Sequence, residues 1–328
     1  MRRAVALSLC LLGLIVAPHG PNPAAGAEDA QRPHALTSKV FDVAAGRLSD
    51  VADGAGLVRP VSLVLLGEVH DNPAHHQVRA RLIAEALRAH PEWRPAVVFE
   101  QIDTDQQPAL DQFTARVETG DGSAAADELL RLLAWDKSGW PAAALYQPLF
   151  EAVIAAKLPI VAGSPPRDRV RAVARGGISQ IAPEERTRLR LDDAMPAPLA
   201  EALNRELLDS HCGALPPQAI GGMAAAQRYR DAHLADALLS AAQRQRSAIL
   251  IAGNGHVRTD RAVPWHIRER APGSAALSVL LLEVSEDETE PGAYLPLDPE
   301  GKPAADLVIF TARAERGDPC QSLLNMKR

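Results

Sequence analysis

The chain reads Leu63-Val64-Leu65-Leu66-Gly67-Glu68-Val69-His70-Asp71-Asn72-Pro73-Ala74-His75-His76 in its most informative stretch. The apolar run 63–66 predicts a buried strand that ends at a glycine and is followed by a carboxylate and an imidazole. A helix is expected next, because asparagine is a favoured N-cap and proline suits the first helical position. In α/β proteins, ligands bind at the carboxyl ends of the strands. Glu68 and His70 are therefore candidate site residues.

Further apolar runs predict five more strands, and the order of the elements predicts the fold class. Each run is short, which favours strand over helix. Helical patterns lie at about residues 104–145 and 168–246. Strand–helix–strand order implies parallel pairing. We predict an α/β domain over residues 60–328, with a largely parallel sheet flanked by helices and an inserted helical subdomain, after an N-terminal leader (28–59) with one short element. The predicted strands are residues 61–66, 96–100, 159–163, 248–252, 278–284 and 305–310.

The composition argues against a nucleic-acid-binding protein. The formal net charge of the 328 residues is −6, and aromatic residues make up only 4%. A basic surface and aromatic side chains that stack on bases are the usual marks of nucleic-acid binding. Several catalytic motifs are also missing, namely GxSxG, GxxxxGK(S/T), HExxH and GxGxxG after a strand. The sequence gives no support to a serine hydrolase, a P-loop enzyme or a Rossmann dehydrogenase.

The first 27 residues have the pattern of a cleavable secretory signal peptide. Arg2 and Arg3 precede an apolar run from residue 4 to residue 17, and Ala25-Gly26-Ala27 offers a cleavage site. An uncleaved membrane anchor is the alternative, but the run is short for a span and no other stretch is long enough. We expect an exported protein, periplasmic or secreted, with no transmembrane span after cleavage.

The cysteines predict one disulfide. Of the three, Cys10 lies in the predicted signal peptide, and Leu9 precedes it where a lipid-attachment box has a small residue. The mature chain keeps Cys212 and Cys320. In an exported protein two cysteines favour a bond that closes a long loop, and two free buried thiols are the alternative. Because the chain has no CxxC, we expect neither a redox motif nor a cysteine-rich zinc site.

Four of the predicted strands end in polar side chains that can carry chemistry. Glu68 and His70 follow the first of these strands, and Glu100 ends the second. Arg167 follows the third strand and His256 follows the fourth. Because the carboxyl ends of parallel strands lie at one edge of the sheet, we expect these side chains to line one pocket.

Two imidazoles and two carboxylates at one edge allow three interpretations. They form a set that zinc, manganese or iron accepts. They could carry out metal-free acid–base chemistry, with one carboxylate of raised pKa and a histidine that relays the proton. They could also be a polar network that only closes the sheet edge. The candidate catalytic residues are Glu68, His70, Glu100, His256, Arg230 and Asp231, of which the first four are also the candidate metal ligands.

Two more histidines follow the first motif but stay outside the candidate set. His75 and His76 fall in the first turn of the predicted helix, and we expect them to face water. Only one of the two could point back toward His70.

Two motifs share a glycine that is followed three residues later by a histidine. Together with further segments in matching order, they resemble the ChaN-like family, the haem-binding uptake branch of the Tiki superfamily. The resemblance covers about residues 60–270. The segments are Leu65-Leu66-Gly67-Glu68-Val69-His70-Asp71-Asn72-Pro73, Val98-Phe99-Glu100, Tyr146-Gln147-Pro148-Leu149, Ala226-Gln227-Arg228-Tyr229-Arg230-Asp231 and Ile251-Ala252-Gly253-Asn254-Gly255-His256-Val257-Arg258-Thr259-Asp260.

The resemblance implies an exported α/β protein that binds haem or iron in an uptake pathway. Relatives in the superfamily include the erythromycin esterases and the Tiki metalloproteases. In those relatives the positions that match Glu68, His70, Glu100 and His256 line the active or metal site. Family members that carry haem use a tyrosinate ligand, often across a dimer, so a homodimer is an expectation here.

The tyrosinate expectation directs attention to Tyr146 and Tyr229, with Tyr294 the third tyrosine of the chain. A tyrosinate needs a nearby cation that lowers the pKa of the phenol, and Arg228 or Arg230 could supply it. The alternative for Tyr146 and Tyr229 is a partly buried helix tyrosine with its hydroxyl at the surface. The candidate cofactor-binding residues are Tyr146, Tyr229 and Arg167.

Two functions are therefore carried forward, with haem or a divalent metal ion as the cofactor or ligand. The leading one is haem or iron binding in uptake, in which the spectrum of bound haem depends on a tyrosine and is largely indifferent to His70. The alternative is a metal-dependent hydrolase, in which the metal lowers the pKa of a bound water and a carboxylate accepts its proton. In that case metal binding depends on both His70 and His256.

Overall fold

The computed structural model describes residues 34–51, 61–119, 125–318 and 320–321. These residues belong to one compact unit that begins at His34. The predicted signal peptide, residues 1–27, lies outside the described residues. Among the described residues, no helix has the length and apolar character that crossing a membrane requires.

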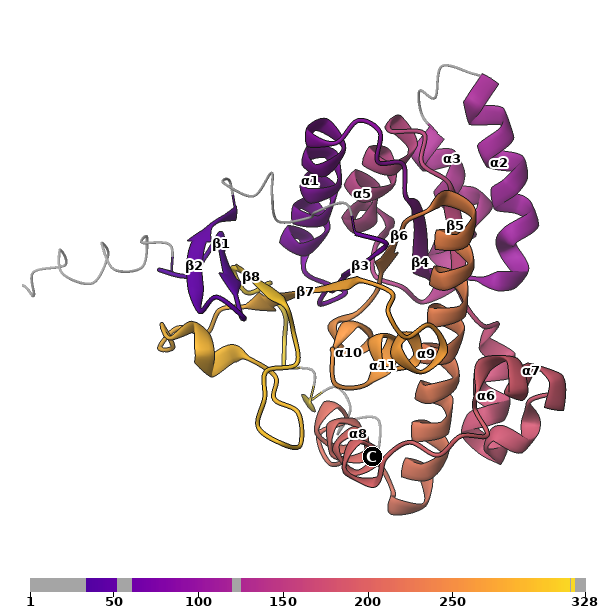
Figure 1. Ribbon diagram of the computed structural model, residues 1–328, viewed down its shortest axis with the longest axis vertical. Coiled ribbons are helices and arrows are strands. Elements are labelled where there is room, and N and C mark those ends of the chain that lie inside the picture. Colours follow the sequence, from indigo (N-terminus) through magenta and orange to yellow (C-terminus); the bar gives the residue numbers. More distant parts are fainter. Residues whose placement is uncertain (1–33, 52–60, 120–124, 319, 322–328) are drawn as a thin grey trace, which may run out of the picture. The chain divides into compact units, whose positions relative to one another are not determined.

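Eight described strands form one sheet in the order β2-β1-β8-β7-β3-β6-β4-β5 (Figure 1). Strands β3 to β8 run parallel to their neighbours within that group, whereas β1 pairs antiparallel with both β2 and β8. The predicted α/β class with a largely parallel sheet is confirmed. The strands are β1 Lys39–Asp42, β2 Arg47–Asp50, β3 Leu63–Leu66, β4 Ala96–Asp103, β5 Ile160–Ser164, β6 Ala248–Ile251, β7 Ala276–Glu283 and β8 Leu307–Thr311.

Helices occupy both stretches of predicted helical pattern. Short 3-10 turns lie between the longer elements of the described residues, among them η3 Thr104–Gln106, η4 Ile178–Gln180 and η5 Pro291–Tyr294. The α-helices are α1 Pro73–Ala89, α2 Gln107–Thr119, α3 Ala125–Leu132, α4 Trp135–Ser138, α5 Ala143–Ala155, α6 Arg167–Gly176, α7 Pro183–Leu189, α8 Ala197–Ser210, α9 Pro217–Gln245, α10 Asn254–Val257 and α11 Ala262–Arg270.

The segment expected to be an N-terminal leader contributes two strands instead of one short element. β1 and β2 form a hairpin, and β1 joins the sheet beside β8. Val40 in β1 is buried, whereas most of β2 is exposed. A strand at the edge of a sheet presents little apolar surface, so its pattern in the sequence is weak. The compact unit therefore begins before the predicted domain start at residue 60.

Strand β3 is covered on both faces, which explains its uninterrupted apolar run. Val64 and Leu66 belong to a core layer shared with α1, α2, α3 and α5. Leu63 and Leu65 belong to a second layer shared with α9 and α11. Successive side chains of a strand point to opposite faces, and all four of these are at most 1% exposed. With both faces covered, the strand ends are what remains for a site.

The turn between β3 and α1 is held by local and by tertiary contacts. The Asn72 side chain accepts a hydrogen bond from the backbone N–H of Ala74 at 2.8 Å, and Pro73 occupies the first helical position. Both features of the predicted helix start are confirmed. Gly67 allows a close approach, because a Cβ at this position would collide with the side chain of Asn254.

Helix α9 packs on the sheet and also against α6, α7 and α8. Leu234 and Leu238 pack in the core layer on the sheet, while Tyr229 packs in a separate cluster with residues of α6 and α7. Gly222 permits α9 to cross α6 closely, since a Cβ there would collide with the backbone of Ala174. α9 also contacts α8, which brings side chains of α8 to the same cleft as the strand ends.

A disulfide joins Cys212, in the turn after α8, to Cys320. The two Cα atoms are 5.6 Å apart, although the residues are 108 positions apart in the sequence. The expected disulfide is confirmed. It fixes the turn that follows α8 to a segment close to the C-terminal end of the chain.

We predict that replacing both Cys212 and Cys320 by serine lowers the free energy of unfolding by about 2–4 kcal/mol, because the bond restricts a long loop in the unfolded chain. Urea denaturation followed by circular dichroism measures the change. Dithiothreitol should lower the stability of the wild type and leave that of the double variant unchanged. A wild-type stability that is insensitive to the reductant contradicts the prediction.

Candidate functional site

The ends of β3, β6 and β4, which are neighbours in the sheet, open into one cleft of about 490 Å³. Helix α9 adds two charged residues to this cleft, and α8 adds apolar side chains. The structure thus brings together the six residues that were singled out as catalytic candidates. They are Glu68, His70, Glu100, Arg230, Asp231 and His256.

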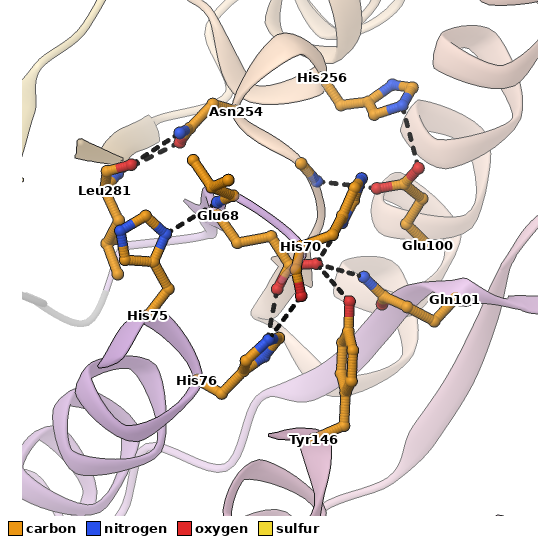
Figure 2. Close-up of polar contacts among 12 residues, drawn as sticks. Glu68, His70, His75, His76, Glu100, Gln101, Tyr146, Asn254, His256 and Leu281 are labelled. Atoms are coloured by element: carbon orange, nitrogen blue, oxygen red, sulfur yellow. Dashed lines mark hydrogen bonds and ion pairs between the residues drawn. The ribbon is translucent and has the colours of Figure 1, made fainter. Parts of the chain in front are cut away.

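Glu68 is the centre of a first polar cluster (Figure 2). Its buried side chain forms an ion pair with Arg79 of α1, which is buried as well. The same carboxylate accepts hydrogen bonds from the Tyr146 hydroxyl at 2.8 Å and from the Gln101 amide at 2.9 Å. His70 Nδ1 lies 2.5 Å from Glu68 Oε1. A buried carboxylate is stable only when it is paired and hydrogen-bonded, and this cluster provides both.

The His70 ring turns one nitrogen away from this cluster. An ionised carboxylate can only accept hydrogen bonds, so the proton shared with Glu68 lies on His70 Nδ1 and Nε2 keeps its lone pair. The ring lies against Gly253, where a Cβ would come within 3.0 Å of Cε1 and Nε2. Trp140 packs edge-on to the ring, with centroids 4.9 Å apart. Burial lowers the pKa of His70, whereas the negative charge of Glu100 raises it, and the net shift is downward. His70 is therefore a neutral imidazole that can bind a metal or accept a proton.

His256 is the centre of a second polar cluster. Its Nδ1 lies 2.6 Å from Asp231 Oδ1, and its Nε2 lies 3.1 Å from Glu100 Oε1. Glu100 also pairs with Arg230 and accepts the Gly253 N–H at 2.7 Å. Burial by itself would lower the pKa of His256, but the two carboxylates raise it to about 9. Burial would raise the pKa of Glu100, but His256 and Arg230 hold it well below its usual value. His256 is thus an imidazolium with both nitrogens engaged.

His75 and His76 are buried, so the expectation that they face water was wrong. His75 Nδ1 accepts the Val69 N–H at 2.8 Å, and its Nε2 lies 2.8 Å from the Thr311 hydroxyl. His76 Nε2 donates to the His70 carbonyl at 2.9 Å. Burial lowers the pKa of both to about 4, so both are neutral at pH 7. The two rings support the backbone of the turn that carries the site.

None of the three tyrosines of the chain lines the cleft. The Tyr146 hydroxyl is used by the first cluster. The Tyr229 hydroxyl donates to Glu185 at 2.9 Å, and that of Tyr294 donates to the Glu288 carbonyl at 2.6 Å. Tyr146 and Tyr229 are fully buried, so neither has the surface hydroxyl that was considered as the alternative. Burial raises the pKa of both phenols.

The arginines expected to favour a tyrosinate serve other partners. Arg228 donates to the carbonyl of Asp193 at 2.9 Å, and Arg230 pairs with Glu100. A phenol of raised pKa is the opposite of what tyrosinate ligation requires. The geometry of this chain therefore gives no support to a tyrosinate ligand.

Arg167 lies beside the main cleft, in a neighbouring pocket of about 290 Å³. Arg171 and Arg230 line the same pocket, and Trp140 and Arg230 are shared with the main cleft. Asp103 is the acidic residue of this pocket, and burial raises its pKa. Three guanidinium groups against one carboxyl make the pocket suited to anions.

The four predicted metal ligands are divided between the two clusters. In the described part of the chain, no three histidine, cysteine, aspartate or glutamate side chains are grouped so that they could hold a metal ion. The physical reason is that Glu68 and Glu100 each neutralise an arginine and contact an imidazole. Their oxygens are already used by protein cations.

Three residues of these clusters were not singled out from the sequence. Arg79 follows His76 by three positions, a spacing that places both on one face of a helix and that offers a usable signal. Gln101 follows Glu100 in β4, and neighbouring side chains of a strand point to opposite faces. Gln101 therefore belongs to the cluster around Glu68, and Glu100 belongs to the cluster around His256. Trp140 lies in an irregular segment, where no periodic pattern identifies it.

We predict that Glu68→Leu lowers the free energy of unfolding by about 3–5 kcal/mol, because it leaves Arg79 buried without its partner. Burial lowers the pKa of Arg79 to about 10, so it stays charged at neutral pH. Tyr146→Phe removes one hydrogen bond to a charged acceptor and should cost about 1–3 kcal/mol. Urea denaturation measures both losses, with the exposed Glu92→Gln as the control. Equal losses for Glu68→Leu and Glu92→Gln contradict the assignment of Glu68 as the centre of the cluster.

We also predict that His256 makes stability depend on alkaline pH. Its pKa rises from 6.5 to about 9 on folding, so its stabilising effect is complete below about pH 6.5 and is lost as the pH rises through about 9. The free energy of unfolding should fall across this window in the wild type and less steeply in His256→Gln. Urea denaturation at several pH values measures the slope, with His90→Gln as the control. An unchanged slope in His256→Gln refutes the protonated state.

The chain is similar to a known protein family and to several solved structures. The model for the family described as haem-binding uptake, Tiki superfamily, ChaN matches residues 57–267. A solved structure of ChaN of Campylobacter jejuni, described as showing cofacial haem binding, is 19% identical, with 82% of this chain and 95% of that chain covered and a TM-score of 0.61. The type III effector HopBA1 is 14% identical, with 77% and 88% covered and a TM-score of 0.40. A Bacillus cereus protein is 11% identical, with 80% and 90% covered and a TM-score of 0.38. No curated protein sequence is significantly similar.

The matched segment contains both Gly-x-x-His motifs and all residues of the two polar clusters. The likeness to the Campylobacter jejuni structure shows that the fold is shared. The chain belongs to the haem-binding uptake family of the Tiki superfamily that includes ChaN.

Proposed function

We propose that this protein binds haem in the cleft at the sheet edge and takes part in haem uptake as an exported protein. The volume and lining of the cleft carry the proposal. Its volume of about 490 Å³ lies in the usual range for small-molecule sites. Apolar surface comes from Trp140, Met195, Leu203 and Leu207, and polar groups come from the two clusters. Such a lining suits a flat apolar ring that carries a few polar groups.

The neighbouring arginine pocket suits the acidic edge of the same ligand. Haem carries two propionates, and guanidinium groups bind carboxylates with paired hydrogen bonds. Arg167, Arg171 and Arg230 line this pocket, and Trp140 and Arg230 line the main cleft as well. A ligand with its ring against the apolar side chains could therefore extend its carboxylates toward these arginines.

In this proposal haem is the transported ligand, and its uptake supplies iron. The signal-peptide pattern of residues 1–27 supports export to the periplasm or beyond. The Campylobacter jejuni relative, described as binding haem cofacially, supports the same ligand class. The family resemblance also carries the expectation of a homodimer, which the mass of the haem-loaded protein tests.

A metal-dependent hydrolase receives less support from the donor groups. His256 has one ring nitrogen against Asp231 and the other against Glu100, so both nitrogens are engaged within the protein. Glu68 and Glu100 neutralise arginines. For these reasons the two histidines and two carboxylates do not act as one ligand set in this geometry.

We predict that haemin titrated into the purified mature protein gives a saturable, shifted Soret band. The double variant Arg167→Ala/Arg171→Ala should bind haemin about 10-fold more weakly, because it loses roughly 1–2 kcal/mol of charge-assisted contacts to the propionates. Arg88→Ala, at the C-terminal end of α1, is the matched control. Absorption titration gives the affinities, and light scattering gives the mass of the loaded protein.

A different result in the same titration would contradict haem binding. If the mature protein shows no saturable change with haemin and instead copurifies with a divalent metal that His70→Ala and His256→Ala both remove, the haem proposal fails and the hydrolase replaces it.

A further inference from the structure

Helix α8 forms one wall of the cleft but contributes little to the core. Four of its side chains line the cleft, at spacings of three and four residues that place them on one face of a helix; they are Leu203, Glu206, Leu207 and Ser210. Of the 14 residues of α8, all of which are described, only Leu203 is buried. The helix packs mainly on α9 (Figure 1). The position of this wall therefore depends on ties at particular points.

An ion pair and a covalent bond provide these ties. Glu206, in the middle of α8, pairs with Arg261, which is buried and lines the cleft as well. At the C-terminal end, Cys212 is bonded to Cys320. The hydrogen bonds of residues 210–214 that lie outside regular helix join positions at most five apart. Among the polar and covalent interactions of the described residues, the disulfide alone joins this turn to a distant part of the chain.

The residues next to the bond are also residues of the cleft. Leu207, Ser210 and His211 line it, and Cys212 follows directly. His211 Nδ1 lies 2.8 Å from the carbonyl oxygen of Leu207, so the imidazole is attached to the last turn of α8. A displacement of this turn therefore moves apolar and polar parts of the wall together.

The bond lies where a reductant can reach it. Both cysteines are half-buried, and their neighbours Gly213 and Gln321 are exposed. Cys212 has a φ of 55°, a left-handed conformation that residues other than glycine keep only when the surrounding structure holds them. Exposed or strained disulfides are the ones that exchange readily with thiols, whereas structural disulfides resist reduction. The surroundings of this bond therefore favour exchange.

We propose that the bond between Cys212 and Cys320 is a site of thiol–disulfide exchange with a dithiol reductant, and that its reduction loosens α8 and lowers the affinity of the cleft for its ligand. The identity of that ligand, haem, rests on the proposed function. With the bond formed, α8 holds its cleft-facing side chains in place. With the bond reduced, the C-terminal end of α8 is free to move, and the cleft loses part of its wall.

The exchange is a two-electron reduction in two steps. A thiolate of the reductant attacks one sulfur of the bond and forms a mixed disulfide, while the other cysteine leaves as a thiolate and takes up a proton. The second thiolate of the reductant then attacks the mixed disulfide and closes the reductant's own disulfide. The second cysteine leaves in turn as a thiolate and takes up the other proton. The chain gains two electrons and two protons, and the dithiol is oxidised.

Hydrogen exchange followed by mass spectrometry tests the loosening without any ligand. The protein is reduced with dithiothreitol, and its thiols are blocked with iodoacetamide. The amides of α8 should then exchange at least about 10-fold faster, because local opening of this helix costs less free energy. Cys212→Ser/Cys320→Ser should show the same acceleration without reductant. Peptides from α5 are the internal control and should exchange as in the oxidised protein.

A haemin titration tests the effect on binding. The reduced and blocked protein and the double serine variant should bind haemin at least about 10-fold more weakly than the oxidised wild type, mainly through faster release. Blocking matters because a free cysteine thiolate can itself bind haem iron. Leu36→Ala is the control for lost stability, since Leu36 is buried in the core and does not line the cleft. It should keep the wild-type affinity.

Reversal completes the test. Reduced wild type that is left unblocked and is oxidised again should recover its affinity for haemin. Equal exchange of α8 in oxidised and reduced protein, or equal haemin affinity in both, overturns the proposal. The same loss of affinity in Leu36→Ala also overturns it, because lost stability is then the cause. Oxidised wild type that does not bind haemin overturns the proposed function instead, and the exchange of α8 still decides whether the bond fixes this helix.

Discussion

The buried carboxylate of Glu68 is the group on which the rest of the site depends. A charge without water must be neutralised and hydrogen-bonded where it stands. Arg79 provides the opposite charge, while Gln101, Tyr146 and His70 provide the hydrogen bonds. These partners come from α1, β4, α5 and the turn after β3. One carboxylate therefore ties three elements to the end of β3, and the same contacts fix the orientation and the tautomer of the His70 ring.

The two clusters differ in their electrostatics, and this difference decides what each histidine can do. His256 lies between Glu100 and Asp231 and keeps its proton. The carboxylate that His70 contacts, Glu68, is already neutralised by Arg79 and therefore does not stabilise a proton on His70. Burial favours the neutral His70 ring as well. The protonated ring holds the edge of the sheet together, and the neutral ring offers a lone pair to the cleft.

The convergence of polar strand ends could be predicted, because parallel strands bring their carboxyl ends to one edge and the runs before Glu68, Glu100 and His256 are plainly apolar. The burial of His75 and His76 could not, because the first turn of a helix is usually open to water. In the folded chain His75 contacts Thr311 of β8, and the His76 ring lies 4.0 Å from the ring of Tyr146 in α5. Tyr146 and Tyr229 were placed on helices correctly. The direction in which each hydroxyl points depends on partners that helical spacing does not reveal.

The amino-acid sequence by itself determined the six strands β3 to β8, the helix cap at Asn72, the family and the meeting of the two motifs at the sheet edge. These follow from local properties, namely apolar periodicity, capping chemistry and the direction of the strands. Only the tertiary structure decided which nitrogens are engaged and which are free. The partners that settle this lie far away in the chain: Gln101 and Tyr146 are 33 and 78 positions from Glu68, and Gly253 is 153 positions from Glu100. Hydrogen bonds over such separations exist only once the chain has packed.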